Sequence, residues 1–478
     1  MTSFIADGVP PTPINTLISL LNARSSQYPD KVVFSFLEDV RLLEGTSLTY
    51  EGLRRKATAI AAALQSLQAQ NERVLLIYKP GLEFIQAFWG CLYAGAIAVP
   101  AYPPRKNHHF ERLQSILHNA EAKFVLTTQA GFENFATQSQ DWTELAKANW
   151  IATDVIAPEV QNSWVEPQIC SEQLALLQYT SGSTGTPKGV MLQHRHLLSN
   201  SQLIHQCFQD TPNSVGVCWL PPYHDMGLIG GILQPIYVGA STVLMDPVSF
   251  LQKPLRWLEA ISRSKASTAG GPNFAYALCA DAIKEKDCEG LDLSSWKVAF
   301  TGAEPIQALT LRRFAEKFAP FGFTQTAFLP CYGMAEATLM VTGAGRTSLP
   351  RVKQVETEAL RSHQVIEVQP TTTQLTGSTS DPTAITELVS CGAPIGNTKV
   401  HIVDPETKAL CQPGEIGEVW VTSPSIAAGY WQKPELTQDT FAAHISESQA
   451  GPFLRTGDLG FLDAGDLFIT GRLKELII

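Results

Sequence analysis

Residues 174–189 read LALLQYTSGSTGTPKG, a strand-like apolar run followed by a loop rich in glycine and hydroxyl residues. Three glycines allow close backbone approach to a ligand, successive hydroxyl and N–H groups donate to phosphate oxygens, and Lys188 adds a cation. It is not a Walker loop, which needs Gly-Lys-Ser/Thr at a helix start, because Pro187 precedes the lysine here. The stretch therefore predicts a polyphosphate-binding loop; the alternative is a flexible hairpin of Ser, Gly and Thr.

Helices and strands alternate on both sides of this loop. Leu53, Ala57, Ile60 and Leu64 recur at helical spacing behind a capping residue, Thr49, and a short apolar strand follows at 74–78. Further strands are expected at 97–101, 123–127, 174–179, 215–220, 242–245, 298–301 and 325–329, and further helices at 110–119, 251–262 and 308–318. The alternation predicts an α/β fold with mainly parallel, helix-covered sheets.

The sequence pattern changes towards the carboxyl end of the chain. From Cys391 on, KVHIVD, EVWVTS, FLRTG and DLFITG are short strands between Gly, Pro and Asp residues, which predicts a small β-rich subdomain. Residues 344–388 fit neither pattern, and PTTTQLTGSTSDPT within them is expected to be an exposed loop. The expected organisation is a first α/β subdomain at 1–215, a second at 216–390 with an insertion near 344–388, and the β-rich subdomain at 391–470.

Composition excludes several classes of protein. The 478 residues are 44% hydrophobic and only 17% charged, which indicates a well-packed globular chain. The formal net charge of −10 disfavours nucleic acid as a partner. Nine scattered cysteines form neither a disulfide framework nor a zinc motif, and no signal or membrane-spanning segment is evident. We expect a soluble cytoplasmic protein.

Six more blocks accompany the loop, in one order: LPPYHDMGLIGG at 220–231, GGPNFAYALC at 270–279, TGAEPI at 301–306, CYGMAEAT at 331–338, RTGDLG at 455–460 and GRLKELII at 471–478. With them the chain resembles the adenylate-forming superfamily over nearly its whole length, and most closely the fatty acyl-AMP ligases. Such enzymes join a carboxylic acid to ATP, releasing pyrophosphate and forming an acyl-adenylate. The resemblance thus implies the large domain of an adenylate-forming enzyme, with two helix-covered sheets and a small β-rich subdomain.

The resemblance also implies roles for individual residues. Catalytic roles fall to Lys188, His224 and Glu336, and Glu336 is also the expected Mg²⁺ ligand. Nucleotide binding is expected from Thr180, Ser181, Gly182, Ser183, Thr184, Gly185, Gly302, Ala303, Glu304, Tyr332, Gly333, Met334, Asp458 and Arg472. The acyl pocket is expected to include Met226, Gly227, Asn273, Phe274 and Tyr276, and Lys474 to mark a hinge.

For several of these residues, a purely structural role is the alternative to a role in the site. Tyr332 is expected to stack on adenine, yet burial in a core is physically similar. Asp458 is suited to accepting hydrogen bonds from two ribose hydroxyls, although Thr-Gly-Asp is also a common turn. His224 is expected beside the carboxylate and the α-phosphate, whereas a lone histidine is more often structural. The acyl-pocket residues are explained nearly as well by core packing, and Glu336 by a solvated loop.

The chemistry requires few catalytic groups. A carboxylic acid is already ionised at pH 7, so attack on the α-phosphate needs no general base, only alignment and charge neutralisation of two anions. ATP and Mg²⁺ are therefore the expected cofactors. The resemblance, which includes the insertion near 344–388, implies that the acyl group passes to an acyl carrier protein in polyketide or lipopeptide assembly. A fatty acyl-CoA ligase and a non-catalytic nucleotide-binding module are the alternatives.

Members of the resembled family differ from this sequence at its carboxyl end. Ile478 falls just past the expected hinge, and relatives carry a small further domain whose lysine contacts the reacting carboxylate. From this difference we expect the 478 residues to bind ATP and acid but to form the adenylate slowly.

Overall fold

The computed structural model describes residues 14–39, 44–103, 110–137, 145–180, 187–368 and 384–475. Contacts between residues divide the chain into two compact units, each described by itself below. Unit 1 comprises residues 1–202, 210–251 and 427–434, and unit 2 comprises 203–209, 252–426 and 435–478. The subdomain boundaries expected from the sequence stay a prediction.

Unit 1 contains a six-stranded sheet in the order β6-β5-β3-β4-β7-β8. Its strands are β3 (Arg73–Ile77), β4 (Ile97–Ala101), β5 (Phe124–Thr127), β6 (Asn149–Ala152), β7 (Leu174–Thr180) and β8 (Lys188–Gln193). All neighbours are parallel except β7 and β8, which are antiparallel. The central strands are buried on both faces, as helix-covered parallel strands are.

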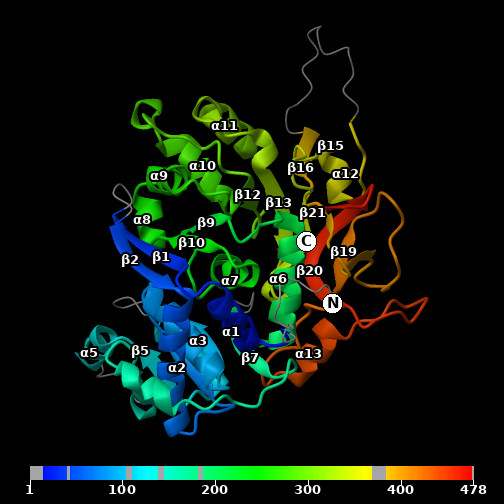
Figure 1. Cartoon of the computed structure of the whole chain (residues 1–478). Coiled ribbons are helices and arrows are strands. Elements are labelled where there is room, and N and C mark those ends of the chain that lie inside the picture. The colour runs from blue at the N-terminus through cyan, green and yellow to red at the C-terminus, as the bar shows by residue number, and fades with distance from the viewer. Residues whose placement is uncertain are drawn as a thin grey trace. The chain divides into compact units, whose positions relative to one another are not determined.

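Further strands of unit 1 pair in the order β9-β10-β1-β2, and only the β1–β2 pair is antiparallel. These are β1 (Val32–Asp39), β2 (Glu44–Thr49), β9 (Val215–Cys218) and β10 (Ser241–Leu244). The helices of the unit are α1 (Leu17–Gln27), α2 (Tyr50–Ser66), α3 (Leu82–Tyr93), α4 (Phe110–Ala120), α5 (Gln129–Thr137), a π-helix η4 (Met226–Leu233) and α7 (Gln234–Val238). Helices α2 and α3, in blue, lie side by side (Figure 1). As predicted, Thr49 caps α2 by accepting from the N–H of Gly52.

Unit 2 is built from strands that pair in the orders β17-β14-β13-β12-β11 and β18-β19-β20-β21. The first set is β11 (Thr268–Gly271), β12 (Val298–Thr301), β13 (Phe328–Gly333), β14 (Met340–Gly343) and β17 (Ala393–Pro394), of which β11, β12 and β13 are parallel. The second set is the predicted β-rich region, with β18 (Lys399–Val403), β19 (Gly417–Thr422), β20 (Leu454–Asp463) and β21 (Asp466–Arg472), all antiparallel. The helices are α9 (Leu255–Ser264), α10 (Asn273–Ala282), α11 (Ala308–Phe318) and α12 (Thr357–Arg361). Three helices, α6 (His194–Phe208), α8 (Pro247–Gln252) and α13 (Pro434–Phe441), include residues of both units.

The structure confirms the predicted α/β class and corrects two of its elements. Residues 251–262 are not one helix: α8 ends before Lys253 and α9 begins after Pro254, because proline has no N–H to continue a helix. The strand expected at 325–329 is β13, which begins at Phe328 because the exposed residues 325 and 326 belong to a 3₁₀ turn.

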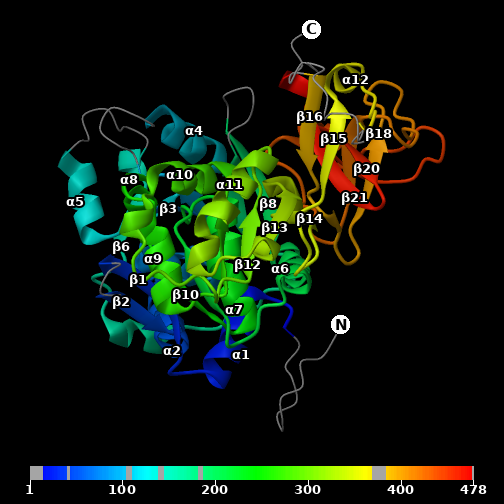
Figure 2. The same cartoon turned by 90° about the horizontal axis from the view of Figure 1, so that it is seen from above.

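Residues within and just after the segment 344–388, which fitted neither pattern in the sequence, form a two-stranded sheet. Strands β15 (Val352–Glu356) and β16 (Ile385–Val389) pair antiparallel beside the four-stranded sheet (Figure 2). Burial alternates along β15, but one inward residue is Lys353, so hydropathy did not reveal the alternation. The sequence PTTTQLTGSTSDPT lies outside the described residues.

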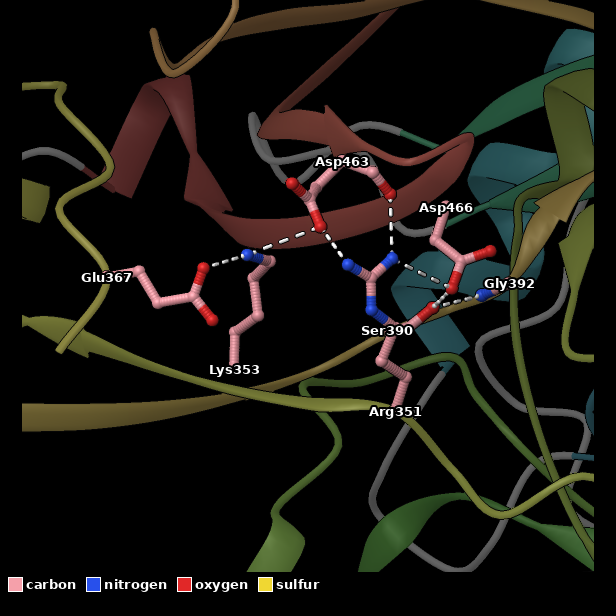
Figure 3. A network of polar contacts seen from close by, with 7 residues as sticks. All are labelled: Arg351, Lys353, Glu367, Ser390, Gly392, Asp463 and Asp466. Carbon is pink, nitrogen blue, oxygen red and sulfur yellow. Dashed lines mark hydrogen bonds and ion pairs between the residues drawn. The ribbon is translucent and has the colours of Figure 1, made fainter. Parts of the chain in front are cut away.

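An ionic network joins β15 to the turn between β20 and β21 (Figure 3). The ammonium of Lys353, whose side chain is only 8% exposed, lies 2.5 Å from Glu367 Oε2 and 3.2 Å from Asp463 Oδ2. Arg351 donates to the Asp463 carboxylate and to its backbone oxygen. Asp466 accepts from the Ser390 hydroxyl. These ion pairs compensate the charge of Lys353, which explains why a lysine is tolerated on the inner face of the strand.

Two features bear on the environment of the protein. All nine cysteines are free thiols. Among the described residues, no helix has both the length and the apolar character needed to cross a bilayer.

Candidate active site

The residues predicted for the site fall into two groups, one in each unit. In unit 1, β7 and β8 form a hairpin whose last paired residues are Thr180 and Lys188. The loop residues Ser181, Gly182, Ser183, Thr184 and Gly185 lie outside the described part of the chain. Lys188 Nζ lies 5.1 Å from the ring centroid of Tyr430, a cation–π contact that holds the ammonium at the base of the loop.

His224 lies in the turn between β9 and the π-helix. Its Nδ1 is 2.6 Å from Oδ1 of Asp225, while the side chain stays 53% exposed. This hydrogen bond raises the pKa of His224, against the opposing effects of burial and of the positive charge on Arg112. Because Nδ1 is engaged, Nε2 is the nitrogen that the imidazole offers to a ligand. Asp225, the next residue in the sequence, is thus the neighbour that orients the ring.

The π-helix η4 carries two of the residues predicted for an acyl pocket, Met226 and Gly227, and both are buried. Asp225 Oδ1 accepts from the N–H of Met226 at 2.7 Å and so starts the helix. A Cβ at position 227 would lie 2.1 Å from the carbonyl oxygen of Pro221, so only glycine fits. π-Helices are rare and frequently occur at functional sites.

In unit 2, Asp458 lies at the centre of three interacting side chains. Its Oδ2 accepts from the Tyr332 hydroxyl at 2.7 Å, and its Oδ1 accepts from Arg472 Nε at 3.0 Å. The residue is only 6% exposed. A carboxylate has two acceptor oxygens, so this residue type suits the two hydroxyls of a vicinal diol. Three residues predicted from three separate motifs are thereby brought together.

Tyr332 is largely buried in a hydrophobic cluster with Val341, Val400 and Val419. Burial, together with the neighbouring Asp458 carboxylate, raises its pKa well above the usual range, so its hydroxyl is a hydrogen-bond donor. This environment is compatible with the core role that the sequence left open. Stacking of the ring on adenine stays a proposal.

Glu418 positions the turn that carries Asp458, and sequence reasoning missed it. The side chain is 2% exposed, and its Oε2 accepts from Trp420 Nε1 and Arg455 Nε at 2.8 and 2.9 Å. Oε1 accepts from the N–H of Gly457 at 3.1 Å. Glu418 lies on β19 and the turn on β20, and nothing in a single sequence links these positions.

Glu336, the predicted Mg²⁺ ligand, lies in the tight connection between β13 and β14. Gly333 starts this connection, and a Cβ there would lie 1.7 Å from the Leu339 carbonyl oxygen. Met334 then donates its N–H to the same oxygen. Among the described residues, no three His, Cys, Asp or Glu side chains gather to hold a metal. A single carboxylate nonetheless fits Mg²⁺, which commonly takes its other ligands from phosphates and water.

The segment after β12, which contains Gly302, Ala303 and Glu304, is hydrogen-bonded to the start of α10. Glu304 Oε1 accepts from the N–H of Phe274 at 2.6 Å, and Asn273 Oδ1 accepts from the N–H of Gln307 at 3.1 Å. Two segments predicted to serve nucleotide and acyl group are thus mutually fixed.

The remaining predicted residues differ in exposure. Tyr276 is fully buried, bonds to the Phe300 carbonyl oxygen and packs against Trp257 and Phe314. This environment is compatible with the core role that the sequence left open, and a place in the acyl pocket stays a prediction. Lys474 is exposed in the short turn Leu473–Glu475 that follows β21.

Comparison with known proteins identifies the family. Residues 21–431 match the family described as AMP-binding enzyme. The chain is 43% identical over 468 residues to the medium-chain-fatty-acid–[acyl-carrier-protein] ligase JamA of Moorena producens, covering 97% of this chain and 78% of that protein. It is 36% identical over 481 residues to a putative fatty-acid–CoA ligase of Mycobacterium tuberculosis, with coverages of 97% and 80%.

A solved structure agrees with these relatives. The fatty acyl-adenylate ligase of L. pneumophila, in complex with acyl adenylate and pyrophosphate, aligns with a TM-score of 0.89 at 43% identity, covering 97% of this chain and 78% of that one. The chain therefore belongs to the AMP-binding enzymes. Within them it is a fatty acyl-AMP ligase, an ATP-dependent enzyme that forms acyl-adenylates.

Proposed function

We propose that this enzyme activates a medium-chain fatty acid and delivers it to an acyl carrier protein. The main support is the 43% identity over nearly the whole chain to a ligase named for that acid class and that acceptor. In the proposed reaction a carboxylate oxygen attacks the α-phosphorus of ATP, the bond from that phosphorus to the bridging oxygen breaks, and pyrophosphate leaves. The acyl-adenylate then passes its acyl group to the carrier's thiol, and AMP is released.

Each predicted residue has its own part in this proposal. Lys188 and the loop before it bind the phosphates that leave, and His224 offers Nε2 to oxygen atoms at the reacting centre. Asp458 accepts the ribose hydroxyls, held by Tyr332 and Arg472. A Mg²⁺ ion bound by Glu336 would neutralise charge on the phosphates. No general base is assigned, because the acid is already ionised.

The acceptor is the part of the proposal most in need of a test. A relative at 36% identity is named as a putative fatty-acid–CoA ligase, so coenzyme A is the second candidate. We also propose a reducing compartment such as the cytoplasm, because all nine cysteines are free.

The test uses radiolabelled acids from C6 to C18 with ATP and Mg²⁺, and offers coenzyme A or a phosphopantetheinylated carrier protein as the acceptor. We expect the highest kcat/KM near C8 to C12 and acyl transfer to the carrier only. Release of acyl-CoA at a comparable rate would favour the second candidate. Binding of ATP with no acid-dependent pyrophosphate release would instead indicate a non-catalytic nucleotide-binding module.

A further inference from the structure

A second group of side chains, which the motifs did not indicate, lies near the carboxyl ends of β4 and β7. Strands β4 and β7 are parallel neighbours, and Ala98 is paired with Leu176. Counting four residues on from this pair brings Tyr102 level with Thr180, where the phosphate loop begins. Ligands of open parallel sheets bind at this carboxyl edge.

Tyr102 is joined there by Tyr223, the residue before His224. The two ring centroids are 3.9 Å apart. Gln178, two residues before the phosphate loop, donates from Nε2 to the Tyr223 carbonyl oxygen at 3.0 Å. The aromatic pair and His224 are therefore tied to the strand that leads into the loop.

Arg112 of α4 completes the group. Its guanidinium carbon lies 5.8 Å from the ring centroid of Tyr102, and its charge opposes protonation of His224. The Nε of Arg112 is buried, yet it has no hydrogen-bond partner among the residues that the structure describes. Over the same ranges, no carboxylate forms an ion pair with it.

A partly buried guanidinium without a carboxylate partner is costly unless an anion arrives to pair with it. Its planar fork suits carboxylate and phosphate oxygens, and the cation–π contact with Tyr102 helps to hold it in place. We propose that Arg112 binds an anionic oxygen of the reactants next to His224. The inference rests on the proposed function, in which two anions must be held together, and it adds the cation that relieves their repulsion.

The anionic oxygen has two possible sources, the fatty-acid carboxylate and the ATP phosphates, and one set of variants distinguishes them. The variants are Arg112→Gln, which removes the charge, and Arg112→Lys, which keeps it without the planar fork. Arg55→Gln, on an exposed arginine of α2, is the matched control. Each is assayed for Kd of ATP by calorimetry, and for KM of decanoate and kcat by pyrophosphate release, with Tm measured in parallel.

We expect R112Q to lower kcat/KM about 10- to 100-fold, R112K to recover most of this loss, and R55Q to stay within twofold of wild type. A rise in KM for decanoate with unchanged Kd for ATP identifies the carboxylate, and a rise in Kd for ATP identifies the phosphates. Values for R112Q within twofold of wild type would overturn the inference. So would equal loss of activity in R112Q and R112K with a lowered Tm, which indicates a structural role.

The same experiment separates this inference from the function on which it rests. If wild-type protein releases no pyrophosphate with decanoate, the proposed function fails and the inference with it. If wild type is active and R112Q equals it, only the inference about Arg112 fails.

Discussion

The hydroxyl of Tyr332 donates a 2.7 Å hydrogen bond to Oδ2 of Asp458, although the two residues lie 126 positions apart in the sequence. The bond joins the end of β13 to β20, and Arg472 of β21 pairs with the other carboxylate oxygen. Two strands from one sheet and one from another thus fix a single buried carboxylate. In the proposed site this geometry preorganises the carboxylate, so that little entropy would be lost when the ribose diol binds.

Replacing Asp458 should weaken nucleotide binding without unfolding the protein. In D458N the charged acceptor is lost, and a hydrogen bond to a charged group contributes about 1.5 to 3 kcal/mol, or roughly 10- to 100-fold in Kd. Y332F removes only one supporting hydrogen bond, so we expect a change of a few fold. Calorimetric titration with ATP measures both, and D439N, an exposed carboxylate on α13, is the control. Equal Kd values for D458N and D439N would exclude Asp458 from the nucleotide site.

Glu418 should contribute to stability as well as to the position of Asp458. In E418Q the partly buried Arg455 loses its counter-ion, which we expect to lower the free energy of unfolding by about 2 kcal/mol. The Gly457 N–H keeps an acceptor only if the amide oxygen turns towards it. Urea denaturation measures the loss, and E435Q on the exposed face of α13 is the comparison. An unfolding midpoint for E418Q that matches E435Q would contradict this role.

Lys353 and Asp463 should be energetically coupled. Both are drawn in Figure 3, and Lys353 lies on the buried face of β15. A double-mutant cycle with K353M and D463N should give a coupling free energy of about 1 to 2 kcal/mol, because the pair is only partly solvated. Arg351 also contacts Asp463, so D463N alone should be more harmful than K353M. A coupling free energy indistinguishable from zero would show that the network does not fix β15.

Acid should destabilise the protein through His194. This residue is buried, its Nδ1 accepts from the N–H of Leu17 at 3.2 Å, and burial lowers its pKa to about 4. An unfolded histidine titrates near 6.5, so the unfolded state gains protons first as the pH falls, and stability is lost between pH 6.5 and 4. The expected loss at pH 5 is about 2 kcal/mol.

The stability of wild type should therefore be constant above pH 7 and fall below it. H194N should flatten part of this slope, whereas H118N, at an exposed position, should leave it unchanged. Identical slopes for wild type and H194N, measured by urea denaturation from pH 8 to pH 5, would contradict the assignment.

Much of the fold was predictable because local patterns and tertiary structure agree. The helix at 308–318 and the strand at 97–101 were predicted at their observed bounds, since each is a clear apolar period with definite ends. The strand β15 was not predictable, because one of its two inward residues is Lys353, which only the folded partners Glu367 and Asp463 neutralise. Local hydropathy carries no information on such a partner.

Some residues of the candidate site could likewise be predicted from the sequence, and others could not. His224 and Asp458 belong to recognisable motifs, so the sequence indicated them. Glu418 and Arg112 contact residues that are distant in the sequence or on other elements, and no spacing along the chain indicates these contacts. Tyr276 stays undecided between the acyl pocket and the core, because an aromatic residue in a motif and one in a core look the same in a sequence.

The most direct measurement is detection of decanoyl-AMP by mass spectrometry after incubation of the protein with decanoate, ATP and Mg²⁺, with pyrophosphate quantified alongside. We predict decanoyl-AMP and pyrophosphate in equal amounts for wild type, and at least tenfold less of both for K188M and for D458N. The absence of decanoyl-AMP from wild type, or its formation at undiminished rate by both variants, would contradict acyl-adenylate formation by these residues.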